Sequence, residues 1–262
     1  MVSARAPWPE LTVNLSDLVS VLRSIICHMR TLSLSGLILG VVFTAFTVAC
    51  DVGTGEMQNL TRSVELDKAD SVDVELAMGA GELSVTGGAA KLMEAGFHFN
   101  VPSWEPLVDY QGGVRGNLRV RQPNSAAAFG HTENRWDLRL NDRVPIDLTA
   151  RLGAGEATLV LGTLNLRSLE IHEGAGELRL DLRGTPKQSY DVRINGGVGR
   201  ARIQVPRSAG VFATATGGIG SINIEGLQKR GDTWYNPDHE KDPIAIHLDV
   251  KGGVGEINVS AE

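Results

Sequence analysis

Apolar and polar residues alternate with period two along much of this chain, on both sides of a short motif that contains two glycines. Residues 168–171 and 178–182 show the alternation clearly. This pattern is typical of strands with one buried face. The motif, Gly-x-Gly, begins at Gly79, Gly153, Gly174, Gly197, Gly218 and Gly253. The pattern therefore predicts strands that turn sharply at each motif, because glycine reaches positive φ without steric cost.

The motifs between residues 153 and 218 follow one another at a short and nearly constant period. They begin 21, 23 and 21 residues apart, which is typical of a solenoid rather than of a catalytic motif. One such coil cannot bury its inner face, whereas stacked coils share a core in which each aliphatic side chain contributes roughly 1.5–3 kcal/mol. We expect the inward ladder of the C-terminal coils to include Leu159, Leu180, Ile203, Ile224 and Val259.

No helical periodicity is evident past residue 60, so the sequence predicts an all-β fold. The first motif is separated from the second by 74 residues, far more than the period of the later ones. We interpret the chain as a linker over 51–59 and two β modules, an N-terminal one over 60–145 and a C-terminal solenoid over 146–262. The two modules could be separate or stacked into one body.

The N-terminal region is typical of a secretory signal. Met29 begins a short basic start, an apolar run extends from Leu32 to Val48, and Ala49 precedes Cys50. A cysteine directly after a small residue suggests a bacterial lipoprotein in which Cys50 is lipidated, although Thr47 stands where such signals usually have Leu. The alternative is an uncleaved membrane anchor, since the run is close to the shortest length that spans a bilayer.

Residues 1–28 do not fit in front of such a signal. We interpret them as a mis-called N-terminal extension, with synthesis starting at Met29; the alternative is a genuine amphipathic prefix. In either case residues 29–50 are expected to carry the β modules out of the cytoplasm. The expected location is the cell envelope, on its extracytoplasmic side.

Composition and motifs exclude several kinds of chemistry. The formal net charge of −6 makes nucleic acid an unexpected partner. The two cysteines, Cys27 and Cys50, lie before the β modules, which therefore have no disulfide framework. The sequence contains no phosphate loop, nucleophile elbow or zinc-protease motif, and its histidines lack metal-ligand spacing. We predict no catalytic residue, no metal and no cofactor.

Two features remain as candidates for binding. Glu156 and Glu177 occupy equivalent turn positions, with Arg200 next in the column, which could form a weak cation or ligand site or a hydrated edge partly neutralised by Arg200. The interval between Gly218 and Gly253 grows to 35 residues and contains Trp234 and Tyr235. This insertion could bind a partner or cap the end of the stack.

The repeated glycine turns with flanking strands, behind a lipoprotein-like signal, resemble the toast-rack families, which include the C-terminal domains of LiaF-type envelope-stress proteins. The stretch from Val64 through Gly79 to Leu83, together with Trp104, is similar to the N-terminal toast-rack module, and the repeats after Gly153 resemble the rack itself. The resemblance implies a right-handed β-helix-like stack on a bacterial envelope, with a role in sensing or protein interaction and without catalysis. Trp104 joins the candidates for binding or capping.

These observations predict a non-enzymatic, envelope-anchored β-solenoid that serves as a scaffold or binding module for an envelope protein or a wall component. The alternative is a carbohydrate-active or ligand-binding β-helix protein. Carboxylates clustered with arginine in a groove on one sheet face would favour the enzyme, whereas an even spread of charge would favour the scaffold.

Overall fold

The computed structural model describes residues 53–123 and 131–262, which belong to one compact unit. The predicted extension over 1–28, the signal or anchor over 29–50 and the lipidation site Cys50 lie outside the described residues. Within the described ranges, no helix combines the length and the apolar character that a membrane crossing requires.

The described chain is all-β, as predicted, and its strands form one sheet of thirteen. The strands are β1 (Gln58–Val64), β2 (Ser71–Thr86), β3 (Met93–Phe99), β4 (Leu107–Gln111), β5 (Arg115–Arg121), β6 (Asn134–Leu140), β7 (Ile146–Val160), β8 (Leu166–Asp181), β9 (Tyr190–Val205), β10 (Gly210–Glu225), β11 (Gln228–Arg230), β12 (Thr233–Tyr235) and β13 (Ala245–Ala261). Two short 3₁₀ turns, η1 (Pro102–Trp104) and η2 (Pro237–His239), complete the described elements.

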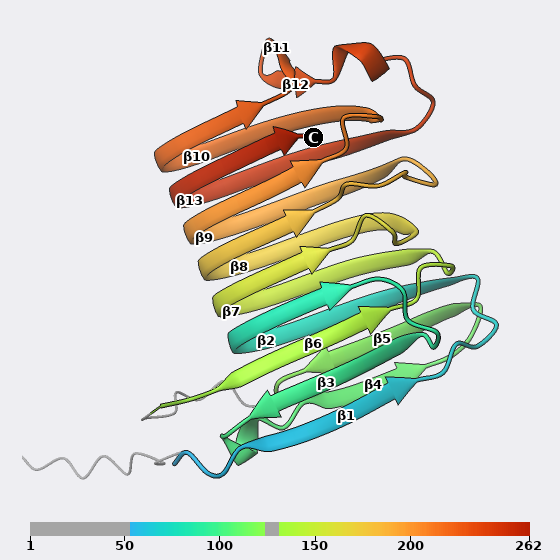
Figure 1. Ribbon diagram of the computed structural model, residues 1–262, viewed down its shortest axis with the longest axis vertical. Coiled ribbons are helices and arrows are strands. Elements are labelled where there is room, and N and C mark those ends of the chain that lie inside the picture. The colour runs from blue at the N-terminus through green and yellow to red at the C-terminus, as the bar shows by residue number, and fades with distance from the viewer. Residues whose placement is uncertain (1–52, 124–130) are drawn as a thin grey trace, which may run out of the picture. The chain divides into compact units, whose positions relative to one another are not determined.

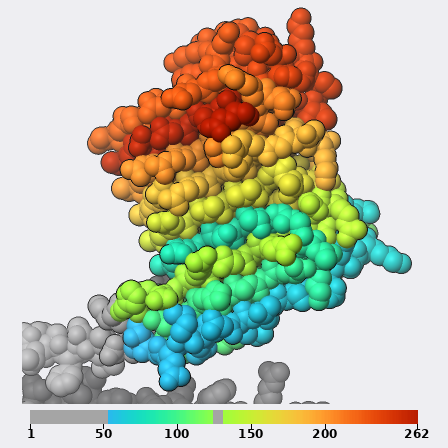
Figure 2. All heavy atoms as spheres, in the orientation of Figure 1, coloured from blue at the N-terminus to red at the C-terminus, as the bar shows by residue number. Residues whose placement is uncertain are grey.

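Six long strands, which we call rungs, each fold back at their Gly-x-Gly motif, so that one strand supplies two arms (Figure 1). The rungs are β2, β7, β8, β9, β13 and β10, in their order along the stack, and neighbouring rungs pair in parallel. Figure 2 shows the same rungs as successive bands of the surface. This arrangement is a toast-rack solenoid, as the sequence predicts.

The second glycine of each motif makes the bend possible. Gly176 has φ +150° and Gly199 has φ +148°, a region that other residues rarely adopt. The bends also stack very closely, because a Cβ on Gly199 would lie 1.8 Å from the carbonyl oxygen of Gly176. Both the turn and the stacking therefore require glycine.

The predicted ladder is confirmed in its register. Leu159, Leu180 and Ile203 are aligned on neighbouring rungs and are almost completely buried. Val259, which is also buried, follows Ile203, and the partly buried Ile224 comes last. The last rung in the sequence thus inserts between β9 and β10, an order that the period alone does not reveal.

The N-terminal strands continue the two arms of β2 as two separate layers. β5 pairs with the first arm and β4 extends that layer, while β6 pairs with the second arm and is followed by β3 and β1. Trp136 and Phe97 lie fully buried between the layers, edge to face, with ring centroids 5.4 Å apart. β2 also pairs with β7 across the expected boundary at residue 145, so strands of both expected modules share one sheet. The division into two modules stays a prediction.

Candidate functional site at the bends of the C-terminal rungs

The inner side of the bend changes character along the stack. The residue before each first glycine forms an aligned column of Met78, Leu152, Glu173, Gly196, Gly252 and Gly217. Met78 and Leu152 are each 4% exposed and fill the bends of β2 and β7. From β9 onward a glycine stands at this position, so the bends of the last three rungs lose the side chain that fills the earlier ones.

A cavity of about 80 Å³ lies at this point, and we call it the bend cavity. It exists because β9 combines Gly196 with Ala201, which lies across the bend, and both residues are small. A Cβ on Gly196 would meet only the Lys251 backbone oxygen within 4 Å, at 3.8 Å, whereas a Cβ on Gly252 would touch Ile257 at 3.0 Å. Protein interiors are normally close-packed, so the space in β9 is an exception within this stack.

Glu173 is the unpaired charged group of the bend cavity, whose lining also includes Arg200, Ser221, Lys251 and Glu256. It occupies the inward position that Leu152 fills one rung earlier, and its Oε1 atom is buried without a hydrogen-bond partner. Burial, reinforced by the negative charge of Glu177, raises the pKa of the Glu173 carboxyl to about 7. No basic side chain in the described ranges forms an ion pair with Glu173. The cavity therefore places one unpaired carboxyl beside the buried apolar side chains of Leu178, Ile194, Val250 and Ile257.

The outer tips of the same rungs are apolar and exposed. Val198, Val254 and Ile219 are aligned neighbours with exposed fractions of 57%, 45% and 73%, and we call them the apolar ridge. The equivalent residues of β2, β7 and β8 are alanines. Single exposed apolar residues are ordinary on protein surfaces, whereas large contiguous apolar patches mark interaction surfaces. These three residues adjoin one another on neighbouring rungs. The ridge also borders the bend cavity.

The predicted column of Glu156, Glu177 and Arg200 is present, and Glu256 follows Arg200 on β13. An open hollow of about 640 Å³ lies over it. Each carboxylate is paired: Glu156 with Arg179 at 3.1 Å, and Glu256 with Arg200 at 3.1 Å. Hydrogen bonds from Asn258 and then Arg200 lower the pKa of Glu256. Two alternatives were open for this column, a weak cation or ligand site and a hydrated edge with partly neutralised charge. The geometry matches the hydrated edge.

Glu177 is the most enclosed member of that column, with 18% of its side chain exposed. It contacts Arg179 at 3.1 Å and Arg202 at 2.6 Å, and it lies 3.8 Å from Arg200. A carboxylate held by three guanidinium groups is a poor general base or nucleophile, because its lone pairs are occupied and its charge is compensated. Its pairing favours a structural role.

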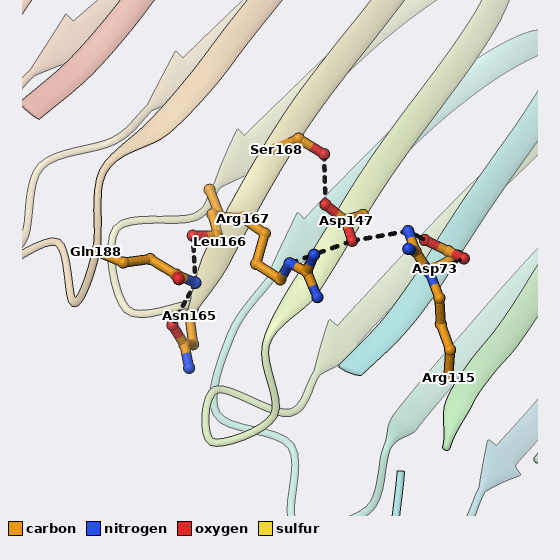
Figure 3. A network of polar contacts seen from close by, with 8 residues as sticks. All are labelled: Asp73, Arg115, Asp147, Asn165, Leu166, Arg167, Ser168 and Gln188. Atoms are coloured by element: carbon orange, nitrogen blue, oxygen red, sulfur yellow. Dashed lines mark hydrogen bonds and ion pairs between the residues drawn. The ribbon is translucent and has the colours of Figure 1, made fainter. Parts of the chain in front are cut away.

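A second polar network lies where the rungs begin (Figure 3). Arg115 donates to Asp73 on β2 and, at 3.1 Å, to Asp147 on β7, so it joins two rungs. Ser168 donates to Asp147 at 2.7 Å, and Arg167 lies 3.6 Å from the same carboxylate. Asp147 is thus fully partnered, and the network fastens the rungs together. Ion pairs occur along the described chain from β1 to β13, so the charge is spread rather than gathered in one groove.

Trp234 and Tyr235 lie on β12, in the insertion that interrupts the period. β12 pairs antiparallel with β10 at Phe212 and Ala213, and β11 pairs with β12 in turn. Tyr235 is 9% exposed and its hydroxyl accepts from Arg230 at 2.7 Å. Trp234 packs against the core, and the Lys229 ammonium lies 4.5 Å from its ring. This arrangement supports the capping alternative for the insertion; a role in partner binding stays a prediction.

Trp104 lies at the other end of the stack, in η1 between β3 and β4. Only 6% of it is exposed, so little of its ring is available to a partner. The described ranges contain no group of three or more side chains suited to hold a metal ion.

Sequence reasoning missed Glu173, Gly196 and Ala201. An alignment of the six motifs would have found them, because the residue before the motif changes from Met or Leu to Glu and then to Gly.

Replacing Glu173 with Gln is expected to change the pH dependence of stability. Because the folded pKa of about 7 lies above the ordinary glutamate value, the folded state holds the proton more tightly, and wild-type stability falls as the pH rises from about 4.5 to 7. Gln cannot ionise. Since Glu173 is only partly buried, we expect Glu173→Gln to gain about 1 kcal/mol above pH 7, or about 2–4 °C in Tm, and almost nothing at pH 5.

Thermal denaturation at pH 5 and pH 8 measures this difference. Glu82→Gln is the matched control, because Glu82 lies at the bend of β2 and is exposed. An equal Tm difference between Glu173→Gln and wild type at both pH values would contradict a raised pKa of the Glu173 carboxyl.

Three comparisons place the chain among known proteins. It matches the family model described as the N-terminal domain of toast_rack, DUF2154, over residues 53–204. A structure of a "putative cell adhesion protein" from Clostridium sporogenes is 30% identical, with a TM-score of 0.76, and covers 79% of this chain and 100% of that chain. A structure of a "putative adhesin" from Bacteroides fragilis is 11% identical, with a TM-score of 0.22, and covers 79% and 99%. No curated protein matches the chain. The family match, over bent rungs that the structure describes, shows that the chain belongs to the Toast_rack_N family.

Proposed function

We propose that the chain is a non-enzymatic, envelope-anchored binding module that uses the bends of its C-terminal rungs to contact an envelope protein or a wall component. The single observation that carries this proposal is the apolar ridge, in which three exposed apolar side chains adjoin one another on neighbouring rungs. The Clostridium sporogenes relative, described as a cell adhesion protein, supports a role in binding.

The bend cavity and the carboxylates support a binding role over catalysis. Ligand pockets usually measure about 300–1,000 Å³, whereas the bend cavity beside Glu173 is about 80 Å³. Glu173 also lines an open hollow of about 620 Å³, but the lining of that hollow contains no second carboxylate. The hollow of about 640 Å³ lies over carboxylates that are already paired with arginine. A carbohydrate-active site would require two carboxyl groups free to act as acid and base or nucleophile.

The proposed anchoring rests on the sequence of the N-terminal region. We expect synthesis to start at Met29 and the mature chain to begin at lipidated Cys50, as the apolar run and the Ala49 junction indicate. Mass spectrometry of the membrane fraction should find the lipid on Cys50, and Cys50→Ser should leave that fraction. Peptides from residues 5–23 in the mature protein, or unchanged membrane association of the variant, would contradict anchoring by Cys50.

Binding is tested by co-purification of the full-length chain from its own envelope. A double variant, Val254→Asp with Ile219→Asp, places charge on the ridge without touching the core, and Val114→Asp is the matched control because Val114 is 77% exposed outside the rungs. We expect the double variant to recover at least tenfold less of an envelope partner than wild type and Val114→Asp recover. Equal recovery by all three proteins would overturn the proposal.

A further inference from the structure

We propose that the bend cavity is a receptor for the side chain of a lysine presented by a partner polypeptide that lies across the apolar ridge. The cavity has an apolar wall and one unpaired carboxyl, which is the complement of a short alkyl chain that ends in an ammonium group. This inference deepens the proposed function and rests on it.

The size of the cavity selects a side chain rather than a larger ligand. About 80 Å³ is well below an ordinary small-molecule pocket but above the space of a single water. The walls include the buried side chains of Ile194, Val250 and Ile257, which would contact the methylene groups. A side chain of this kind would restore the packing that Gly196 and Ala201 leave incomplete.

The charges around the cavity leave Glu173 as the group without a counterion. Arg200 is shared by Glu177 and Glu256, and Lys251 pairs with Asp249 at 3.1 Å. Both cations that line the cavity, Arg200 and Lys251, are thus paired with carboxylates other than Glu173. The Oε1 atom of Glu173 has no hydrogen-bond donor, and an incoming ammonium would supply one.

The cavity is also accessible to a partner. The ridge residues Val198, Val254 and Ile219 form part of its lining, and all three are exposed. β10 is the last rung, and β12 covers it only at Phe212 and Ala213, which leaves its bend uncovered. A polypeptide rather than a free amine is favoured, because a free amine would leave the ridge exposed.

The test is a titration of ¹⁵N-labelled full-length protein, followed through the amides of Gly196 and Ala201. The probes are an acetylated Gly-Leu-Lys-Leu-Gly amide, the same peptide with norleucine in place of lysine, and n-butylammonium. We expect the lysine peptide to bind at pH 8 at least tenfold more tightly than the norleucine peptide and more tightly than butylammonium. If butylammonium binds as tightly as the lysine peptide, a partner polypeptide is not the source of the ammonium group. If the norleucine peptide binds as tightly as the lysine peptide, the ammonium group makes no contact with the Glu173 carboxylate.

Two variants test separately the charge of Glu173 and the free volume of the bend cavity. Glu173→Gln should weaken binding of the lysine peptide at least tenfold, whereas Glu82→Gln should leave its affinity unchanged. Ala201→Leu should also abolish binding, because it fills the cavity with the residue that β8 carries at the aligned position, Leu178. Wild-type affinity should itself fall about tenfold from pH 8 to pH 6, since the Glu173 carboxylate becomes protonated. An unchanged affinity in either variant would overturn the inference.

The same variants distinguish this inference from the proposed function. If Ala201→Leu and Glu173→Gln still recover the envelope partner while the ridge double variant does not, the lysine receptor is wrong and the binding module stands. If the ridge variant also recovers the partner, the proposed function fails as well.

Discussion

Gly199→Ala is expected to lower the free energy of unfolding by at least about 3 kcal/mol, or about 10 °C in Tm. The φ of +148° at Gly199 is costly for any residue with a Cβ, and the new Cβ would lie 1.8 Å from the Gly176 carbonyl oxygen. The backbone of two adjacent rungs would have to separate, because neither atom belongs to a flexible side chain. Calorimetry or thermal circular dichroism of the full-length protein measures the effect.

Gly231→Ala is the matched control. Gly231 also has positive φ, at +62°, but no atom lies within 4 Å of the Cβ that Ala would add. We expect it to cost only about 1–2 kcal/mol. Equal destabilisation by the two variants would show that the close stacking of the bends contributes nothing.

Trp234→Ala is expected to cost about 2–3 kcal/mol, or at least about 5 °C in Tm. Complete burial would place the loss at 3–5 kcal/mol, and Trp234 is only partly buried against the core. The loss should detach β12 from β10 and expose the end of the stack. Thermal denaturation, together with amide exchange of Phe212 and Ala213, measures both consequences.

Lys229→Ala is the control for this prediction, because Lys229 covers the Trp234 ring from solvent and its removal should cost no more than about 1 kcal/mol. An unchanged Tm of Trp234→Ala, with loss of the envelope partner, would identify a partner site instead of a cap. An unchanged Tm with the partner retained would mean that the insertion serves neither purpose.

The sequence predicted the rungs because one local rule repeats in each of them. Alternation defines the inward face, and the Gly-x-Gly pair defines the bend, so Leu159, Leu180 and Ile203 could be aligned without a structure. The strands between 93 and 140 lie outside the repeat. Their pairing with the two arms of β2 depends on long-range contacts, such as that of Phe97 with Trp136, which no local pattern encodes.

The position of β13 could not be predicted for a related reason. Each rung presents a similar edge of backbone groups and a similar inward column, so the period does not say which rung lies next to which. The long insertion after β10 allows the chain to return and place β13 between β9 and β10. The bend cavity cannot be predicted from the Gly-x-Gly motif, because the motif predicts only the turn and Gly196 lies just before it.

Site-specific photo-crosslinking in intact cells tests the central claim, that the bends of the C-terminal rungs are the binding surface. A photoreactive residue replaces Ile219 on the ridge in one protein and Val114, an equally exposed residue outside the rungs, in another. We expect a discrete crosslinked product from position 219, which is lost when Val254 is replaced by Asp, and no product from position 114. No product at 219, or the same products from both positions, would contradict it.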